Sequence, residues 1–296
     1  MRQRPLLQRV VNALRPAAQP IRTAVLRWST GIFTTWNNLR RRAMFRKLNA
    51  QSASAFKPVG PVRVLKRPLP PKVANALFDA AQVTNILATL GVAHRVTGPV
   101  NAALQYWTLS YRNSWGMIFH NDNMALWHQM ILGVSRSADA LSVDAMLRDK
   151  TLLPQRYDRA YGGIPTVMNI ATCSVYLLSG IAKVRSPQGW RWALGDTLRD
   201  QIAADAVRKE VFGTKAPEAA GNLYNARRFF TLAGVGALMI ELGAPAALLN
   251  RRWGQLFSIA AWGMHLGIRI IMGIKFPYNT SGVSYVPFFP VGRELL

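Results

Sequence analysis

The sequence predicts an all-α fold: a polytopic bundle of about five to seven transmembrane segments that follows a basic N-terminal arm. Half of the 296 residues are hydrophobic, and many of them gather in stretches of about 20 residues. A helix that rises about 1.5 Å per residue needs about 20 residues to cross a hydrocarbon core of about 30 Å. Ionisable side chains stand within or at the ends of these stretches, where a charge costs several kcal/mol. We therefore expect a membrane domain with a polar interior over residues 73–296, and an arm over residues 1–72.

The arm carries most of the excess positive charge of the chain. Residues 1–78 contain no Asp or Glu, and 16 of the 37 Lys and Arg residues lie there, in a chain of net charge +24. Such an arm fits an organellar transit peptide, or a disordered or amphipathic segment on anionic lipid headgroups. Nucleic acid is not an expected partner, because no recognised binding module accompanies the charge. The positive-inside rule places the arm in the cytoplasm, which favours a bacterial plasma membrane, with an organellar membrane as the alternative.

Five stretches are expected to cross the membrane, after a Pro-rich spacer over residues 58–71 that ends the arm. They are residues 73–92, 115–134, 164–184, 229–250 and 253–274. Two shorter apolar stretches, residues 100–111 and 283–291, fit re-entrant or interfacial segments, and they account for the upper limit of seven. Most tryptophans lie near the ends of the stretches, as in an interfacial belt.

The loop between the third and fourth stretches, residues 185–225, predicts one further helix. Over residues 196–211, Leu198, Ile202 and Ala206 recur at helical spacing with charged residues between them. This pattern predicts an amphipathic helix on the membrane surface or over the mouth of the bundle. In that place it would be either a lid or a surface helix with no gating role.

Several kinds of chemistry are excluded by what the sequence lacks. Cys173 is the single cysteine, which excludes an internal disulfide and a cysteine cluster for zinc or iron–sulfur. The sequence has no Gly-rich phosphate loop, no nucleophile elbow and no HExxH zinc motif. His120 and His128 fall within about 80 degrees of one helix face, which suits one cavity but predicts no metal site. His120 also stands where a helix start is expected. Any chemistry must come from the polar residues of the membrane stretches.

Four segments, taken in order, carry a resemblance to a known family. Residues 119–147 read FHNDNMALWHQMILGVSRSADALSVDAML, and residues 176–198 read YLLSGIAKVRSPQGWRWALGDTL. Glu241 follows within IELGAP, and His265 within WGMHLGIRIIMGIKFP. Over residues 73–291 the chain resembles the horizontally transferred transmembrane (HTTM) domain family, whose membrane domain is shared with the vitamin K-dependent gamma-carboxylase.

The resemblance implies a helix bundle around a lipid quinone or hydroquinone of the menaquinone or vitamin K type. Lys183 matches the family's base, which deprotonates the hydroquinone, and His120 is implied as a second catalytic residue. His265, His128 and Glu241 are the implied cofactor-binding residues. The residue types suit this chemistry, because a desolvated Lys loses its proton more readily than Arg. A neutral imidazole offers one donor and one acceptor to a quinone oxygen.

Two departures from the carboxylase leave the activity open. The carboxylase carries a large soluble portion that binds its peptide substrate, and we expect no room for one in 296 residues. Where the carboxylase has two adjacent lysines, this chain has Ala182 and Lys183. The resemblance implies a lipid-quinone protein with quinol-dependent oxidation or carboxylation chemistry, and whether it is an enzyme stays open. The alternative is a non-enzymatic membrane scaffold, an immunity protein or an accessory partner on the same fold.

The candidate residues also have purely structural interpretations. Lys183 ends its stretch, where a lysine commonly reaches the headgroups. Glu241 is expected to pair with a basic side chain such as Arg269 or Arg228. His265, flanked by glycines in a Gly-x-x-x-Gly pattern, fits a hydrogen bond between helices or the contact face of a homodimer.

Overall fold

The computed structural model describes residues 8, 11–12, 14–116 and 120–290. These residues fold largely into helices, and no β-strand occurs among them, so the all-α prediction is confirmed. The chain forms two compact units: unit 1 contains residues 1–168 and 290–296, and unit 2 contains residues 169–289. This division differs from the expected boundary after residue 72, because the long helix of the predicted arm is part of unit 1.

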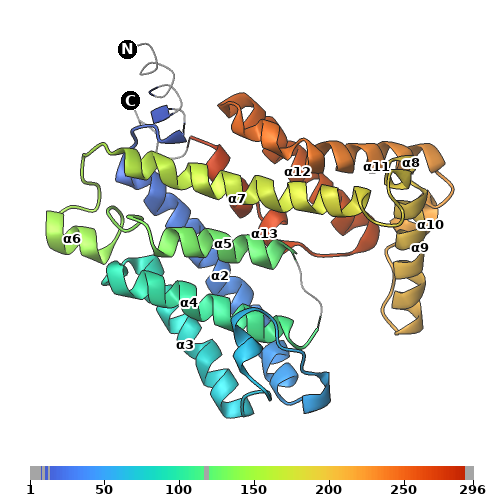
Figure 1. Ribbon diagram of the computed structural model, residues 1–296, viewed down its shortest axis with the longest axis horizontal. Coiled ribbons are helices and arrows are strands. Elements are labelled where there is room, and N and C mark those ends of the chain that lie inside the picture. The colour runs from blue at the N-terminus through green and yellow to red at the C-terminus, as the bar shows by residue number, and fades with distance from the viewer. Residues whose placement is uncertain (1–7, 9–10, 13, 117–119, 291–296) are drawn as a thin grey trace. The chain divides into compact units, whose positions relative to one another are not determined.

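Unit 1 is built from the helices α2, α3, α4 and α5, with shorter helices between them. The bounds are α2 Pro20–Asn49, η1 Ala53–Ala55, η2 Gly60–Val64, α3 Pro71–Leu90, α4 His94–Asn113, α5 His120–Gly133 and α6 Val143–Asp149. A further helix, α7 Arg159–Val184, begins in unit 1 and continues into unit 2. Within unit 1, α2 packs on α3 and α5, and α4 packs on the same two helices (Figure 1).

The helix α2 lies within the predicted arm and is a packed helix of 30 residues. Pro20 at its start has a fixed φ that suits the first turn, where its missing N–H costs nothing. Phe33 and Phe45 are among its buried side chains. Gly31 allows the close approach of α3, since a Cβ there would lie 1.9 Å from the hydroxyl oxygen of Thr89. Part of the basic region therefore belongs to the core of unit 1.

The Pro-rich stretch, residues 58–71, also contributes to that core. Val62 in η2 is fully buried and packs in a cluster with Phe78 and Tyr111. The backbone N–H of Leu69 donates to the hydroxyl oxygen of Tyr111 at 3.0 Å. This stretch, which the sequence predicts as a spacer, is folded against α3 and α4.

Arg27 of α2 holds the loop between α5 and α6. Its guanidinium donates to the carbonyl oxygens of Thr89 at 3.0 Å and Leu141 at 2.6 Å, and also to the carbonyl oxygen of Ser137. The five N–H donors of a planar guanidinium suit such a set of acceptors. Burial lowers the pKa of Arg27 to about 10. An arginine of the predicted lipid-binding arm is thus an internal support of unit 1.

Unit 2 is built around α11 and α12, together with the second part of α7. The other bounds are α8 Arg191–Leu194, α9 Asp196–Val211, α10 Glu218–Leu223, α11 Arg227–Leu242, η3 Ala244–Leu248, α12 Arg251–Met272, α13 Pro277–Thr280 and η4 Val283–Phe288. The helix α11 packs on α8, α9 and α12. The bounds of α9 are those of the predicted amphipathic helix.

The corner between α8 and α9 requires glycine. Gly195 has a φ of 82°, and a Cβ there would lie 2.3 Å from the backbone carbonyl carbon of Phe230 in α11. Only a residue without a side chain takes this conformation in contact with another backbone. The corner therefore fixes where α9 starts relative to α11.

Two helices of the described part of the chain are long and apolar enough to cross a membrane. They are α7, with 26 residues, and α12, with 22 residues. All five predicted stretches contain a helix, but α5 has 14 residues and α11 has 16, fewer than the roughly 20 that a span needs. Of the two shorter apolar stretches, residues 100–111 lie within α4, and η4 covers most of residues 283–291.

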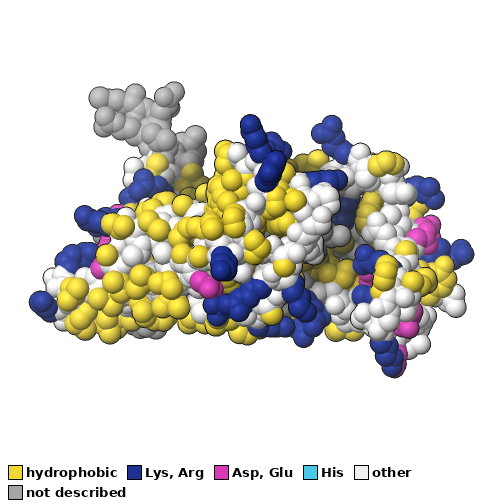
Figure 2. Space-filling model, turned by 90° about the horizontal axis from the view of Figure 1, so that it is seen from below, with side chains coloured by type: hydrophobic (Ala, Val, Ile, Leu, Met, Phe, Trp, Pro, Cys, Tyr) yellow, Lys and Arg dark blue, Asp and Glu magenta, His cyan; other side chains and the backbone are white. Residues whose placement is uncertain are grey.

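Polar side chains are buried and apolar side chains face outward on several helices. In α12, Ser258 and His265 are buried, while Leu256, Ile259 and Ile270 are 57%, 60% and 66% exposed. In unit 1 the buried polar residues include Thr30, Asn85, Asn101 and Gln105, and the exposed apolar ones include Ile32, Leu39, Val83 and Val96. Figure 2 shows broad hydrophobic areas on the visible face, between groups of Lys and Arg. Such contiguous apolar surface usually marks a face that contacts lipid or another molecule.

Candidate functional site

The most distinctive polar contact of unit 2 is an ion pair between Lys183 at the end of α7 and Glu241 near the end of α11. The side chain of Glu241 is 8% exposed and that of Lys183 is 26% exposed. Gly180, one turn before Lys183, allows α11 to approach, because a Cβ there would lie 2.9 Å from the Cβ of Glu241. The sequence predicted that Glu241 pairs with a basic side chain, and the structure identifies that side chain as Lys183, not Arg269 or Arg228.

Trp192 of α8 completes the surroundings of the lysine. The ammonium nitrogen of Lys183 lies 5.6 Å from the centroid of the Trp192 ring, within the range of a cation–π contact. The ammonium group therefore lies between a carboxylate and an aromatic face. Two polar atoms here are buried and have no hydrogen-bond partner among the described residues, Glu241 Oε2 and Trp192 Nε1.

A cavity of about 320 Å³ opens beside this group. Among the described residues that line it, Lys183 alone is ionisable, and nearly all the others are apolar side chains or glycines of α9, α11 and α12. They include Leu198, Ile202, Phe229, Phe230, Leu238, Ile240, Met264, Ile268, Ile271 and Met272. Ligand pockets typically have volumes of roughly 300–1,000 Å³ and are mostly apolar with a few polar groups. This cavity has that character, with one cation at its edge.

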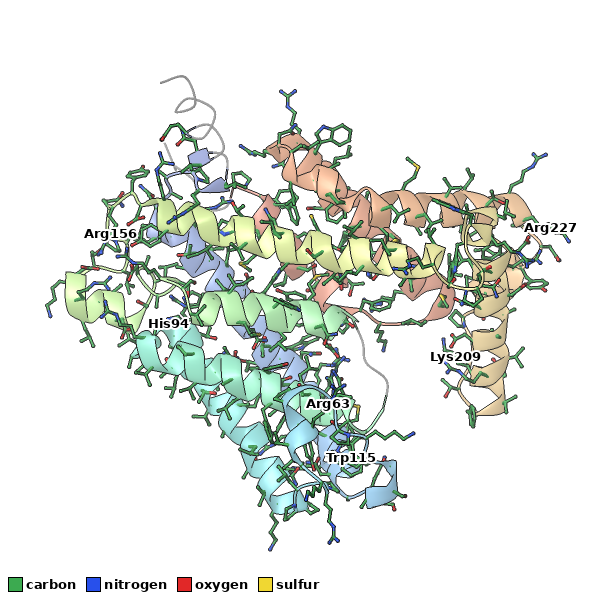
Figure 3. All side chains as sticks on the ribbon, in the orientation of Figure 1. Arg63, His94, Trp115, Arg156, Lys209 and Arg227 are labelled. Atoms are coloured by element: carbon green, nitrogen blue, oxygen red, sulfur yellow. The ribbon has the colours of Figure 1, made fainter. Side chains whose placement is uncertain are left out.

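The amphipathic helix α9 forms one wall of the cavity. Leu198 and Ile202 line it, and Ile202 is buried in a cluster with Phe230. At the other end of α9, Lys209, labelled in Figure 3, donates to the carbonyl oxygen of Met272, which ends α12. The helix therefore covers the cavity with its apolar face and is fastened at its C-terminal end.

His265 belongs to a second, buried polar group in unit 2. Its Nδ1 lies 2.8 Å from the carbonyl oxygen of Ala261 and 3.3 Å from the hydroxyl oxygen of Tyr176 in α7. The hydroxyl groups of Tyr176 and Tyr285 are hydrogen-bonded to each other, and the amide of Asn279 donates to both at 3.1 Å. Because a carbonyl only accepts, the contact with Ala261 fixes the proton on Nδ1. His265 thus takes part in contacts between helices and does not line the cavity beside Lys183.

The remaining two candidate histidines lie in unit 1. His128 of α5 is fully buried, and its Nε2 lies 3.2 Å from the carbonyl oxygen of Met168. His120 begins α5, and its side chain lies outside the described part of the structure. Of the five candidate residues, the structure brings Lys183 and Glu241 together. No three His, Cys, Asp or Glu side chains among the described residues are grouped so that they could hold a metal ion.

Sequence reasoning missed several residues of this region. Trp192 is one of the tryptophans for which the sequence predicts an interfacial belt, although it lies only nine residues after Lys183. Tyr176 lies seven residues before Lys183, so both occupy one face of α7. That periodicity was a usable signal for Tyr176. Tyr285 and Asn279 come from segments without a regular pattern, and only the fold brings them to α7.

Comparisons of the chain with family models, with curated proteins and with solved structures found no match. The residues of unit 2 and their geometry are therefore the basis of the functional proposal.

Proposed function

We propose that this chain is an integral membrane protein that binds a lipid quinone or quinol in the cavity of unit 2. The observation that carries the proposal is the cavity itself: about 320 Å³ of apolar space with the ammonium of Lys183 at its edge. A lipid quinone has a large apolar body and oxygen atoms that accept hydrogen bonds, so it matches such a lining. Its ring would lie among the side chains of α9, α11 and α12, with one oxygen toward Lys183.

Membrane insertion is supported by α7 and α12, which are long and apolar enough to cross a bilayer. The outward apolar and inward polar side chains of both units support it further. We extend the membrane part to α3, α5 and α11, although α5 and α11 alone are shorter than a full span. With them the membrane part has five segments, the lower end of the range that the sequence suggests. Arginines of the N-terminal region remain candidates for contact with anionic headgroups on the cytoplasmic side.

The family resemblance assigns the deprotonation of the quinol to one lysine. We assign a separate role in this step to each residue of the ion pair. Glu241 does not line the cavity itself, but it pairs with Lys183, which does, and its Oε2 is buried without a partner among the described residues. We assign this oxygen as the acceptor of the O–H of a quinol held at Lys183. The ammonium of Lys183 would then lie beside the quinol oxygen that loses this proton. It would stabilise the resulting quinolate once the proton is on Glu241. In this proposal Glu241 accepts the proton and Lys183 supplies the positive charge. His265 would support α7 through Tyr176.

The test is the lipid content of the protein purified in detergent. Quinones are extracted and quantified by chromatography from the wild type, Lys183→Ala and Glu241→Gln. The matched control is Lys215→Ala, since Lys215 pairs with Glu218 on the surface and both side chains are 81% exposed. We expect quinone in the wild type and the control, and a loss of about tenfold or more in Lys183→Ala, since a charge-assisted hydrogen bond is worth about 1.5–3 kcal/mol.

The same preparations separate binding from reaction. Added menaquinol is followed by absorbance in air, and Glu241→Gln is expected to bind quinone but to lose the proton acceptor for quinol. If folded wild-type protein neither contains nor binds quinone, the proposal is refuted. The non-enzymatic scaffold or partner protein would then be the better account of the fold.

A further inference from the structure

Unit 1 contains a separate polar cavity of about 60 Å³ between α2, α4 and α5. Three charged side chains meet at it: Arg41 from α2, Arg112 from α4 and Asp122 from α5. Its other polar lining side chains are neutral, and they include Gln129. Nothing in the proposed quinone function uses this site, which lies wholly within the other unit.

The charges at this cavity do not balance. Arg41 Nη1 donates to both oxygens of Asp122, at 3.1 and 3.0 Å, and Arg112 Nη2 donates to Oδ2 of the same carboxylate. The side chains of Asp122, Arg112 and Arg41 are 8%, 15% and 24% exposed. Two guanidinium groups thus share one carboxylate and leave a net charge of +1. Both arginines are partly buried, so an anion bound beside them would compensate an excess charge that water reaches only in part.

Donors remain available for such an anion. A guanidinium has five N–H donors, and Asp122 takes only one nitrogen from each arginine. Asp122 Oδ1 also accepts from the amide of Asn121 at 3.2 Å, so the carboxylate is already well occupied. The other guanidinium nitrogens of Arg41 and Arg112 have no hydrogen-bond partner among the described residues.

Gln129 adds a second, independent indication. Its Nε2 donates to the hydroxyl oxygen of Thr34 at 2.6 Å, and that hydroxyl donates to the carbonyl of Thr30, so the orientation of the amide is set. Gln129 is 8% exposed, and its Oε1 is buried and has no partner among the described residues. Gln129 lines this cavity and also a smaller one beside Arg27 and His94. A ligand that brings an O–H donor to this cavity, as well as negatively charged oxygens, would satisfy the amide oxygen.

We propose that the cavity binds a monoanionic phosphate group, either dihydrogen phosphate or the singly ionised phosphate monoester of a lipid such as phosphatidic acid. Its charge balances the excess of +1, its oxygens accept from Arg41 and Arg112, and its P–OH donates to Gln129. Guanidinium groups bind phosphate well, because their paired N–H donors match its oxygens. A cavity of about 60 Å³ holds a few waters, and so takes a headgroup and not a quinone ring.

The test measures binding of inorganic phosphate to the detergent-purified protein by calorimetry in chloride buffer. Arg112→Gln is expected to weaken binding about tenfold or more, because a charged hydrogen bond is lost. The matched control is Arg42→Gln, since Arg42 lies next to Arg41 in α2 but pairs with Asp79 outside the cavity, where both side chains are more than 40% exposed. It should leave the affinity within about twofold.

Asp122→Asn is expected to strengthen phosphate binding, a result that misfolding cannot produce. It removes the internal competitor for both arginines, so phosphate binding should become several-fold tighter. Absence of phosphate binding in the wild type, equal losses in Arg112→Gln and Arg42→Gln, or weaker binding in a folded Asp122→Asn would each overturn the proposal.

The source of the phosphate is determined by competition. Short-chain phosphatidic acid, a monoester, is compared with short-chain phosphatidylglycerol, a diester without a P–OH, as competitors of inorganic phosphate. Displacement by phosphatidic acid alone identifies a lipid headgroup site, and displacement by neither identifies a site for free phosphate. Equal displacement by both lipids would overturn the assigned role of the P–OH.

Discussion

Gly180 gives the sharpest test of how the Lys183–Glu241 pair is held. An alanine there would place its Cβ 2.9 Å from the Cβ of Glu241 and 2.9 Å from Cδ2 of Leu242. Nonbonded carbons prefer about 3.5–4.0 Å, so α7 and α11 must separate by about 0.6 Å or more. The Cβ of Glu241 cannot swing away without its backbone. Overpacking of this kind costs about 1–3 kcal/mol.

Gly236→Ala is the matched control, because it is also a glycine within a helix of unit 2 and a Cβ there would meet nothing within 4 Å. Both changes gain about 1 kcal/mol of helix propensity, so the difference between the two variants is the overpacking cost alone. With about 4 °C per kcal/mol for a unit of this size, Gly180→Ala should melt about 4–12 °C below Gly236→Ala.

The assay is thermal unfolding in detergent, followed by circular dichroism for the wild type and both variants. If Gly180→Ala melts at or above the temperature of Gly236→Ala, the close approach of α7 and α11 is refuted. The basis for placing Lys183 at the cavity would then be lost as well.

Three further predictions concern other supports of the fold (Figure 3). Burial, with the nearby charge of Arg27, lowers the pKa of His94 from 6.5 to about 4. Between these pH values the unfolded chain therefore binds more protons than the folded one, and the free energy of unfolding should fall by about 3 kcal/mol as the pH drops from 6.5 to 4. In melting experiments, His94→Gln should reduce this loss of stability. An unchanged dependence on pH in that variant would contradict the assignment. Arg27→Met leaves buried carbonyls unpaired and should cost about 3 kcal/mol or more, whereas Arg63→Met, at an exposed position, should cost less than about 0.5 kcal/mol in the same melts. Lys209→Ala should raise hydrogen exchange of the last turn of α9 about tenfold, and equal exchange in Lys209→Ala and Lys215→Ala would exclude the anchoring contact.

Regular patterns in the sequence predicted much of the fold. The amphipathic spacing of Leu198, Ile202 and Ala206 gave α9 with its bounds, because one apolar face and its flanking charges are a local property of the chain. The apolar stretches gave the positions of α3, α7 and α12 to within a few residues at most ends. The all-α class follows from the same local signals.

What the sequence did not predict depends on contacts between distant segments. The sequence pattern of residues 1–72 did not predict the packed helix α2, because the buried Phe33 and Phe45 are widely spaced among basic and polar residues. The pairing of Lys183 with Glu241 joins residues 58 positions apart, and it requires α7 and α11 to meet at Gly180. The phosphate site of unit 1 likewise combines α2, α4 and α5, and each arginine on its own looks like a surface charge.

The two ends of α9 determine how a molecule could leave the cavity beside it. At one end Gly195 is in contact with the backbone of α11, and at the other Lys209 is bonded to the last turn of α12. With both ends in contact with their neighbours, α9 can swing open as a rigid flap only after one of these contacts breaks. We therefore expect this wall of the cavity to stay in place while a lipid enters or leaves.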